Sequence, residues 1–184
     1  HNTVSGLPNR AYLQERLARE LPRLERAGRQ GALLLVDLDT FKSINDSLGQ
    51  TWGDAVLRQA AERLIGQTSG EELLAHLGAD EFALLLPDLS DAMDQAAVRA
   101  EARATDLHRV LAGAFAVDGQ QLHLSAGIGI TLLPEAGADA DSTFQQADTA
   151  LFEAKKLGRG STRFFHRDMV SSVRRRLEME QELR

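Results

Sequence analysis

The sequence contains no cysteine among its 184 residues, which excludes a disulfide framework and a thiolate metal site. No apolar run approaches the length needed to span a membrane, and no signal peptide is visible. Basic residues are outnumbered 21 to 27, so the net charge of −6 makes a nucleic-acid backbone an unfavourable partner. Internal repeats and low-complexity segments are also missing from the sequence.

The remaining composition is that of an ordinary globular domain. Hydrophobic residues make up 43% of the sequence and charged residues 26%. A chain of 184 residues is long enough to bury a full core within a single domain.

The stretch from Leu73 to Pro87 is the centre of our interpretation. Two short apolar runs flank Gly78-Ala79-Asp80-Glu81, a pattern typical of a β-hairpin with two acids at its tip. Upstream, the apolar run from Ala32 to Val36 predicts a strand buried on both faces, and Asp37-Leu38-Asp39 follows it. Two strands that each end in carboxylates can build a site for a hard cation. Mg²⁺ in particular prefers a few carboxylates together with substrate phosphates.

Apolar periodicity and turn residues predict the other elements and, from their order, one mostly antiparallel sheet covered by helices. We expect Pro22 to kink or split the first helix, and Ile65 and Phe152 to face the core. The expected helices are Pro8 to about Gly28, Phe41 to Leu48, Trp52 to Ile65, Asp91 to Leu111, Asp141 to Leu157 and Asp168 to Arg184. The further expected strands are Ala32 to Leu38, Phe115 to Val117 and Leu122 to Thr131, the last two paired around Asp118-Gly119, and Thr162 to Phe165.

Several motifs together carry a family resemblance. Gly78-Ala79-Asp80-Glu81-Phe82 resembles the signature of the GGDEF family, the diguanylate cyclase domains. One pentapeptide is weak evidence, but four further blocks in family order make a chance match improbable. The resemblance covers about Ser5 to Phe165 and implies an α/β (α+β) fold, a palm-like nucleotide-cyclase sandwich whose mostly antiparallel sheet is flanked by helices. The further blocks are Ser5 to Arg10, Asp37 to Asp46, Gly49 with Gly53-Asp54, and Ala154 to Arg159.

The resemblance also suggests how the chain is divided. It assigns residues 1–166 to a GGDEF-type domain and residues 167–184 to a C-terminal connector helix. Alone, Met169 to Arg184 fits a solvated helix with opposed charges. It also resembles the connector between a GGDEF domain and a following EAL phosphodiesterase domain, so we expect the natural protein to continue past Arg184.

The resemblance assigns a metal site and catalytic acids. Asp37, Asp80 and the main-chain carbonyl of Leu38 are the expected ligands of Mg²⁺ or Mn²⁺, and Asp37, Asp80 and Glu81 are the expected catalytic residues. A bound ion would neutralise a triphosphate and polarise its α-phosphorus. Glu81 could bind a second ion or help to activate the attacking 3′-hydroxyl. Taken singly, Asp37 and Asp80 also fit a strand end and a turn without any metal. Glu81 fits an exposed turn acid as well as it fits a catalytic role.

The same resemblance assigns the nucleotide-binding residues. Asn45 and Asp54 are the expected guanine readers, because a carboxylate accepts both N1–H and N2–H of guanine, whereas adenine has an acceptor at N1. The local alternative is that Asn45 caps a helix end and Asp54 stabilises a helix start. The expected phosphate ligands are Lys42, Lys155, Arg159 and the backbone N–H groups of Thr40 and Phe41; Lys155 and Arg159 could instead complete a helix C-terminus.

Three departures from the family pattern bear on function. Ala79 stands where the family has its second glycine, and a positive φ at that position would cost Ala about 1 kcal/mol. His76 stands where the family usually has Arg. Ser69-Gly70-Glu71-Glu72 aligns with the family's Arg-x-x-Asp product-inhibition motif but lacks its arginine, so we expect no inhibitory site.

Two further patterns carry no function in this interpretation. Gly127-Ile128-Gly129 lies inside a strand pattern and lacks the third glycine of a dinucleotide-binding loop. Four histidines show no metal-ligand spacing and are expected to be surface or half-buried: His76, His108, His123 and His166.

Three functions are left open by the sequence. The first is synthesis of cyclic di-GMP from two GTP molecules by a homodimer. The second is a GTP-binding regulatory module that has lost synthesis and controls an attached EAL domain. The third is a structural dimerisation domain, which would have no physical need for the retained acids, amide and cations. The resemblance further implies an upstream sensor and a cytoplasmic location, either free or as the cytoplasmic part of a membrane-anchored protein.

Overall fold

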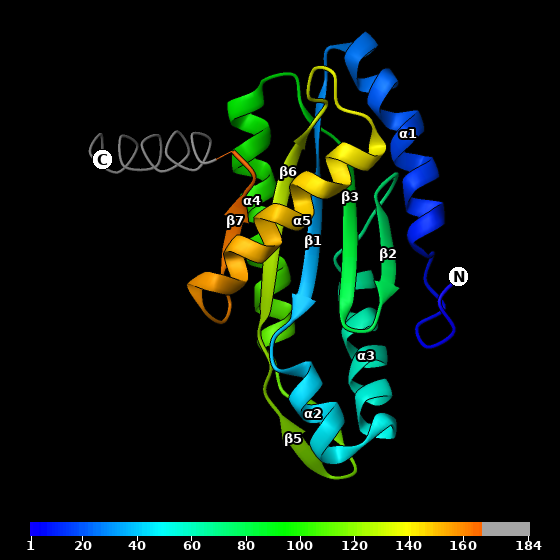
Figure 1. Ribbon diagram of the computed structural model, residues 1–184, viewed down its shortest axis with the longest axis vertical. Coiled ribbons are helices and arrows are strands. Elements are labelled where there is room, and N and C mark those ends of the chain that lie inside the picture. Colours follow the sequence, from blue (N-terminus) through cyan, green and yellow to red (C-terminus); the bar gives the residue numbers. More distant parts are fainter. Residues whose placement is uncertain (167–184) are drawn as a thin grey trace, which may run out of the picture.

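The computed structural model describes residues 1–166, which form a five-stranded sheet with helices on both faces and a separate two-stranded ribbon (Figure 1). The helices are α1 (Arg10–Ala27), α2 (Phe41–Leu48), α3 (Gln50–Ile65), α4 (Met93–Ala112) and α5 (Ala140–Leu157). The strands are β1 (Gln30–Leu38), β2 (Leu73–Gly78), β3 (Glu81–Ser90), β4 (Phe115–Val117), β5 (Gln120–Leu122), β6 (Ala126–Leu133) and β7 (Thr162–Phe164). The main sheet has the order β2-β3-β1-β6-β7, and all its pairs are antiparallel except β6 with β7. The predicted architecture is confirmed.

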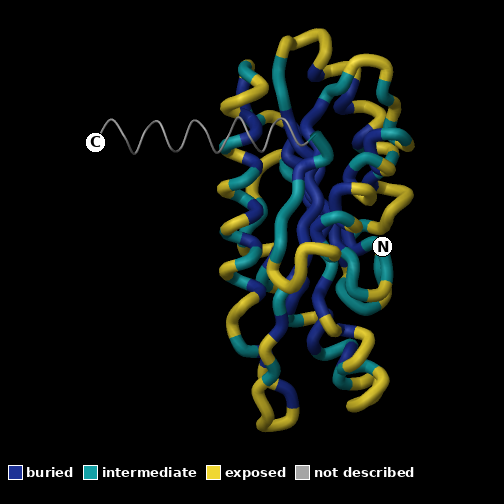
Figure 2. Tube along the Cα trace, turned by 60° about the vertical axis from the view of Figure 1, so that its left-hand side comes forward, coloured by how far each residue is buried: buried dark blue, intermediate teal, exposed yellow. Residues whose placement is uncertain are grey.

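Alternate side chains of β1 enter two separate cores. Leu33 and Leu35 pack with apolar residues of α1 and α5, whereas Leu34 and Val36 pack with those of α3 and α4. All four side chains are at most 1% exposed, so the central strand is buried on both faces as predicted. Figure 1 shows α5 crossing in front of the sheet with α4 behind it, and Figure 2 shows the buried trace running through the middle of the molecule.

Two glycines allow α5 to lie close against β6. A Cβ atom at Gly129 would lie 2.3 Å from the backbone nitrogen of Leu151, a distance that side chains do not tolerate. At Gly127 it would lie 3.0 Å from Cε of Lys155. The Gly-Ile-Gly segment is therefore a strand segment, as predicted, and its missing side chains bring Lys155 close to the sheet.

The ribbon of β4 and β5 differs from the prediction. The expected strand from Leu122 to Thr131 is broken, because β5 pairs only with β4 whereas β6 joins the main sheet beside β1. The intervening Ser125 accepts a hydrogen bond from the N–H of Asp39 at 2.8 Å through its carbonyl and donates its hydroxyl to Asp39 Oδ2 at 2.6 Å. The break thus directs Ser125 toward the end of β1.

Two predictions about single side chains were wrong, and so was a split of the first helix at Pro22. α1 continues through Pro22, and the carbonyl that loses its helical partner belongs to Ala18 on the exposed side, where water can replace that partner; a kink at Pro22 stays a prediction. Ile65 is 47% exposed because it ends α3 beyond the packed part of the helix. Phe152 is 62% exposed on the outer side of α5, where the ammonium of Lys156 lies 4.5 Å from its ring centroid.

Most other element limits agree with the sequence prediction within two residues, and α2 has the expected bounds. No helix within residues 1–166 is both long and apolar enough to cross a membrane. The helix expected from Asp168 to Arg184 lies outside the described residues.

Candidate functional site

Two acidic strand ends meet at one edge of the sheet. The side chains of Leu33 and Leu35 face α1 and α5, and the same alternation puts Asp37 on that face. Glu81 is directly opposite Asp37 in the register of β3 with β1. The N–H of Leu38 donates to the carbonyl of Asp80 at 3.2 Å, which ties the hairpin tip to the end of β1. The structure therefore brings together the acids of the two motifs.

Asp80 and Glu81 hold their protons more tightly than usual. Burial, together with the nearby charge of Asp37, raises the pKa of Asp80 to about 6. Burial, reinforced by the charges of Asp148 and Asp37, raises the pKa of Glu81 to about 7, and its Oε1 is buried without a hydrogen-bond partner. Sequence reasoning missed Asp148, although it lies two helical turns before Lys155 and so on the same side of α5.

Lys155 is the cation that holds the end of β1. Its Nζ lies 2.9 Å from Oδ1 of Asp37 and 2.6 Å from Oδ1 of Asp39, and it also donates to the carbonyl of Asp37 at 2.8 Å. Burial opposes the charge of Lys155, but hydrogen bonds to Asp39 and Asp37 outweigh it and raise the lysine pKa. Burial likewise opposes the charge of Asp39, yet hydrogen bonds from Lys155, Ser125 and Gly160 lower its pKa. Asp39 is therefore an ionised anchor beneath the site.

An open cavity of about 510 Å³ lies over these groups. It combines the carboxylates of Asp37 and Asp80 with exposed cations, so its lining suits a negatively charged ligand that carries its own metal ion. Glu81, Asn45 and Asp54 do not belong to its lining. The lining residues are Asp37, Leu38, Asp39, Thr40, Phe41, Lys42, Asp80, Lys155, Gly158 and Arg159.

The two expected guanine readers lie on neighbouring helices beyond the cavity. Asn45 is on α2, one turn after Phe41, and Asp54 is on α3. A Cβ atom at Gly53 would lie 2.4 Å from Oδ1 of Asn45, so the absence of a side chain there lets the amide of Asn45 approach α3 at the residue that precedes Asp54. The spacing found in the sequence therefore corresponds to spatial proximity.

Two residues near the cavity have left-handed backbones that disfavour side chains. Thr40 has φ 61° and donates its hydroxyl to the carbonyl of Asp39 at 2.6 Å. Ala79 has φ 43°, in the region where a glycine would be free of strain. Such strain persists only where the surroundings fix the backbone.

His76 departs from the sequence prediction. It is 2% exposed, its ring stacks on Phe82, and burial lowers its pKa, so the expected surface or half-buried position is wrong for this residue. The prediction failed because His76 occupies a strand position that faces the core. His108 and His166 are partly buried and His123 is exposed, as expected.

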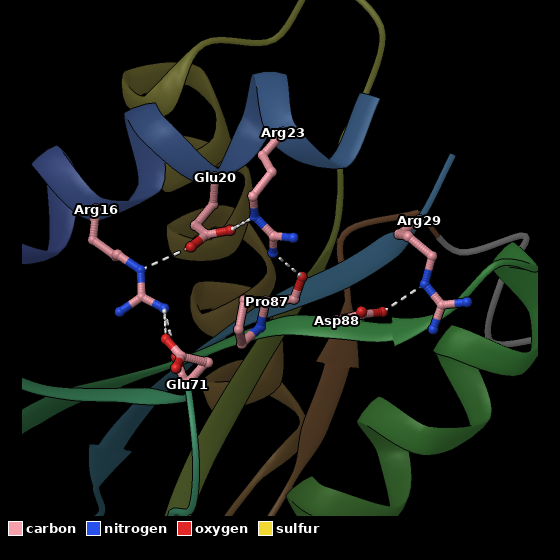
Figure 3. A network of polar contacts seen from close by, with 7 residues as sticks. All are labelled: Arg16, Glu20, Arg23, Arg29, Glu71, Pro87 and Asp88. Atoms are coloured by element: carbon pink, nitrogen blue, oxygen red, sulfur yellow. Dashed lines mark hydrogen bonds and ion pairs between the residues drawn. The ribbon is translucent and has the colours of Figure 1, made fainter. Parts of the chain in front are cut away.

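The stretch aligned with the family's inhibitory motif is enclosed by arginines from other elements. Arg103 of α4 forms hydrogen bonds to both carboxylate oxygens of Glu72, at 2.5 and 2.9 Å. Arg16 of α1 donates to the carbonyl of Glu71 at 2.6 Å, at the edge of the network drawn in Figure 3. Sequence reasoning missed these cations because they come from segments far away in the chain. Both arginines already contact acidic residues or backbone carbonyls.

The protein side chains alone do not complete a metal cage. Within residues 1–166, no group of three or more His, Cys, Asp or Glu side chains is arranged to hold a metal ion. An ion between Asp37 and Asp80 would therefore take its remaining ligands from backbone carbonyls, water or a phosphate.

Comparison with known proteins identifies the family. The model of the GGDEF domain of diguanylate cyclases matches residues 1–161. Over all 184 residues the chain is 39% identical to an uncharacterized signaling protein of Caulobacter vibrioides and 33% identical to MucR of Pseudomonas aeruginosa, a bifunctional diguanylate cyclase/cyclic di-GMP phosphodiesterase. It spans only 22% and 26% of their lengths. The GGDEF domain of TpbB from Pseudomonas aeruginosa has a TM-score of 0.82 at 36% identity, with 95% of this chain and 99% of that one covered. The chain belongs to the GGDEF family of diguanylate cyclase domains.

Proposed function

We propose that this domain condenses two molecules of GTP into cyclic di-GMP. The 3′-hydroxyl oxygen of each GTP forms a bond to the α-phosphorus of the other. The bond from each α-phosphorus to the oxygen that bridges to the β-phosphate breaks, so two pyrophosphates leave. Each hydroxyl proton passes to a base, for which Glu81 is our candidate because burial and neighbouring acids raise its pKa to about 7.

The observation that carries this proposal is the approach of Asp37 and Asp80 beside a cavity that also contains Lys42 and Arg159. Burial and the nearby charge of Asp37 raise the pKa of Asp80 to about 6, and a divalent ion bound between the two carboxylates would relieve this unfavourable arrangement. Cations on the other side of the same cavity suit the phosphates of a nucleotide.

The family implies a requirement for a divalent metal, and the donor set fits Mg²⁺ or Mn²⁺. Asp37, Asp80 and the carbonyl of Leu38 are the residues that would hold it. When bound, such an ion neutralises the triphosphate and makes the α-phosphorus more electrophilic. Asp37 also forms an ion pair with Lys155, whose Nζ lies 2.9 Å from its Oδ1.

The remaining site residues bind the nucleotide in this proposal. Lys42, Arg159 and Lys155 contact the phosphates, together with the N–H groups of Thr40 and Phe41 at the start of α2, which have no partner within the helix. Asn45 and Asp54 bind the edge of guanine. Their proximity across Gly53 supports this assignment.

The whole protein's partners follow from the reaction and from the family. Two domains meet face to face, because each supplies one GTP, so the active species is a homodimer. We also propose a covalently linked EAL domain and an upstream sensor, with this domain in the cytoplasm. Calibrated size-exclusion chromatography with and without GTP tests the dimer.

Ala79 favours a second candidate, a GTP-binding regulatory module without synthesis. Its φ of 43° is unfavourable for Ala, and its methyl group lies at the tip that carries Asp80. A shift of the metal ligand that raises the barrier by ~1.4 kcal/mol would lower the rate about tenfold. The distinction between the two candidates is therefore a matter of rate.

The test is chromatographic detection of cyclic di-GMP after incubation of concentrated protein with GTP and Mg²⁺. Wild type should make product, Asp80→Ala should make none, and Ala79→Gly should be about tenfold faster if the alanine disturbs the tip. Equal rates for wild type and Ala79→Gly would mean that alanine is harmless there. Binding of GTP without product by either protein would leave the regulatory module as the function.

Calorimetry with GTP and ATP tests the guanine readers separately. GTP should bind in a Mg²⁺-dependent manner and more tightly than ATP, and Asp54→Asn should weaken that preference more than it weakens phosphate binding. Equal affinity of wild type for both nucleotides would contradict the roles of Asn45 and Asp54.

A further inference from the structure

The hairpin tip requires an external constraint. Gly78 and Ala79 both have positive φ, 131° and 43°, and the alanine is exposed, so core packing does not hold this turn. An alanine in the left-handed region is disfavoured by roughly 1 kcal/mol relative to an ordinary conformation. Asp80 follows directly, so its direction depends on how firmly this turn is fixed.

His76 supplies such a constraint. Its Nε2 lies 2.8 Å from the carbonyl oxygen of Ala79. The ring is stacked on Phe82, with centroids 4.3 Å apart and planes inclined by 16°, and the backbone N–H of His76 donates to the carbonyl of Pro8 at 2.9 Å. A rigid, buried ring therefore contacts the one carbonyl between Gly78 and Asp80.

The second ring nitrogen determines where the proton lies. A carbonyl oxygen only accepts, so Nε2 must carry the hydrogen in its contact with Ala79. Burial lowers the pKa of His76, which keeps the ring neutral, so Nδ1 is an acceptor. The hydroxyl of Ser5, 2.9 Å away, donates to Nδ1 and favours the tautomer that the Ala79 contact needs.

We propose that His76 is a positioning residue for Asp80: its Nε2–H fixes the carbonyl of Ala79 and so holds the left-handed turn that directs Asp80 toward Asp37. The inference rests on the proposed function, because its consequence is metal-dependent use of GTP. The N–H of Leu38 holds only the main-chain carbonyl of Asp80. Without the contact at Ala79, the exposed turn of unfavourable φ would relax and change the direction of the Asp80 side chain.

Two neutral variants separate this role from packing. In His76→Gln the side-chain amide nitrogen reaches approximately the place of Nε2 and can still donate to Ala79. In His76→Asn the shorter amide reaches only the place of Nδ1, toward Ser5. Both variants lose the ring stack on Phe82, so their unfolding free energies should fall together, and denaturant unfolding is measured to confirm this.

At saturating GTP and Mg²⁺, His76→Gln should retain kcat within about threefold of wild type, whereas His76→Asn should lose about tenfold or more. KM should change less than kcat, because Asp80 is not a guanine-reading residue. Equal losses of kcat in the two variants, at equal stability, would overturn the proposal and leave His76 a packing role.

Calorimetry distinguishes failure of this inference from failure of the proposed function. If wild type binds GTP with Mg²⁺ but makes no product, the proposed synthesis of cyclic di-GMP is wrong. The positioning role of His76 is then tested by the GTP affinities of the variants. The Mg²⁺ dependence of GTP affinity should then be kept by His76→Gln and reduced by His76→Asn. Equal affinities would overturn the positioning role, and a wild type without Mg²⁺-dependent GTP binding would overturn both proposals.

Discussion

Two clusters of charged residues lie at opposite ends of the β2–β3 hairpin, and their acids behave in opposite ways. At the open end, Glu20 is buried between two arginines of its own helix, with Arg16 Nε at 2.9 Å and Arg23 Nε at 2.6 Å (Figure 3). Burial alone would raise the pKa of Glu20, but these two partners lower it. At the tip, Asp80 and Glu81 have raised pKa values of about 6 and about 7.

Burial raises the pKa of all three acids, and the supply of counter-ions decides the direction of the net shift. The open end adds a further matched pair, Arg29 with Asp88 at 2.8 Å, and Arg23 also donates to the carbonyl of Pro87. The tip gathers more acids than the basic groups beside them can neutralise, because Lys155 is already shared between Asp37 and Asp39. A fold that keeps such a surplus of negative charge loses stability, so the surplus marks a place where a cation is expected.

The largest expected effect separates the two clusters by activity. Asp80→Asn removes one carboxylate of the proposed metal site with little change in shape, so cyclic di-GMP synthesis should fall by roughly a thousandfold. The matched change Glu20→Gln at the open end should leave the rate unchanged within about twofold. Initial rates at saturating GTP and Mg²⁺ measure both, and an Asp80→Asn rate within tenfold of wild type would refute the metal-ligand role.

The next expected effect is on the free energy of unfolding, and it compares a lysine at the tip with an arginine at the open end. Lys155→Met leaves Asp37 and the buried Asp39 without their shared partner, and should lower the free energy of unfolding by about 2–3 kcal/mol. Arg23→Met should cost about 1 kcal/mol or less, because Arg16 still pairs with Glu20 and Arg23 is largely exposed. Urea unfolding of the metal-free proteins gives both values. Similar losses would mean that the two clusters are equally well compensated.

The pH dependence of stability should have opposite signs at the two ends. Asp80 and Glu81 bind protons more tightly when folded, so the metal-free protein should become more stable as pH falls from about 8 toward 5. Glu20 has a lowered pKa, so its contribution is present above about 4.5 and is lost as pH falls below that value. After allowance for partial exposure, the gain at the tip should be about 1–2 kcal/mol.

Thermal unfolding in the presence of a chelator, repeated with Glu81→Gln, measures this dependence. The variant should show a flatter profile between pH 8 and 5 than wild type. An unchanged slope would show that Glu81 does not bind its proton more tightly in the folded protein.

The last prediction is that an effect is absent: product inhibition by cyclic di-GMP near the open end of the hairpin. We predict no product inhibition through Ser69 to Glu72, because Arg103 and Arg16 already contact Glu72 and Glu71 there. Added cyclic di-GMP should inhibit wild type and Glu72→Gln alike, by competition at the active site only. Tight binding of cyclic di-GMP that is lost on changes at Ser69 to Glu72 would contradict the prediction.

Much of the fold could be predicted because the relevant signals are local. The continuous apolar run of β1, the limits of α2 and the hairpin with acids at its tip depend on residues close together in the chain. The errors arose where distant segments decide. Leu122 and Ala126 follow each other closely in one apolar stretch, yet they belong to different sheets because Ser125 is bound to Asp39.

The sequence by itself predicted two acidic motifs, each at the end of a strand, and the structure makes β1 and β3 neighbours and so brings the motifs together. It also placed Asn45 and Asp54 at a spacing that packing across Gly53 turns into proximity. The roles of these residues in metal and guanine binding stay predictions. Antiparallel pairing of β1 with β3 then aligns Asp37 with Glu81.

Only the tertiary structure decided which charges are neutralised. Lys155 reaches Asp37 and Asp39 because Gly127 and Gly129 let α5 lie close to β6, and no local pattern specifies that approach. The contact of His76 with Ala79 depends likewise on a buried ring that the histidine spacing did not predict. Pairing over such distances depends on how helices pack on the sheet, since Coulomb interactions and hydrogen bonds act on spatial proximity and not on sequence separation.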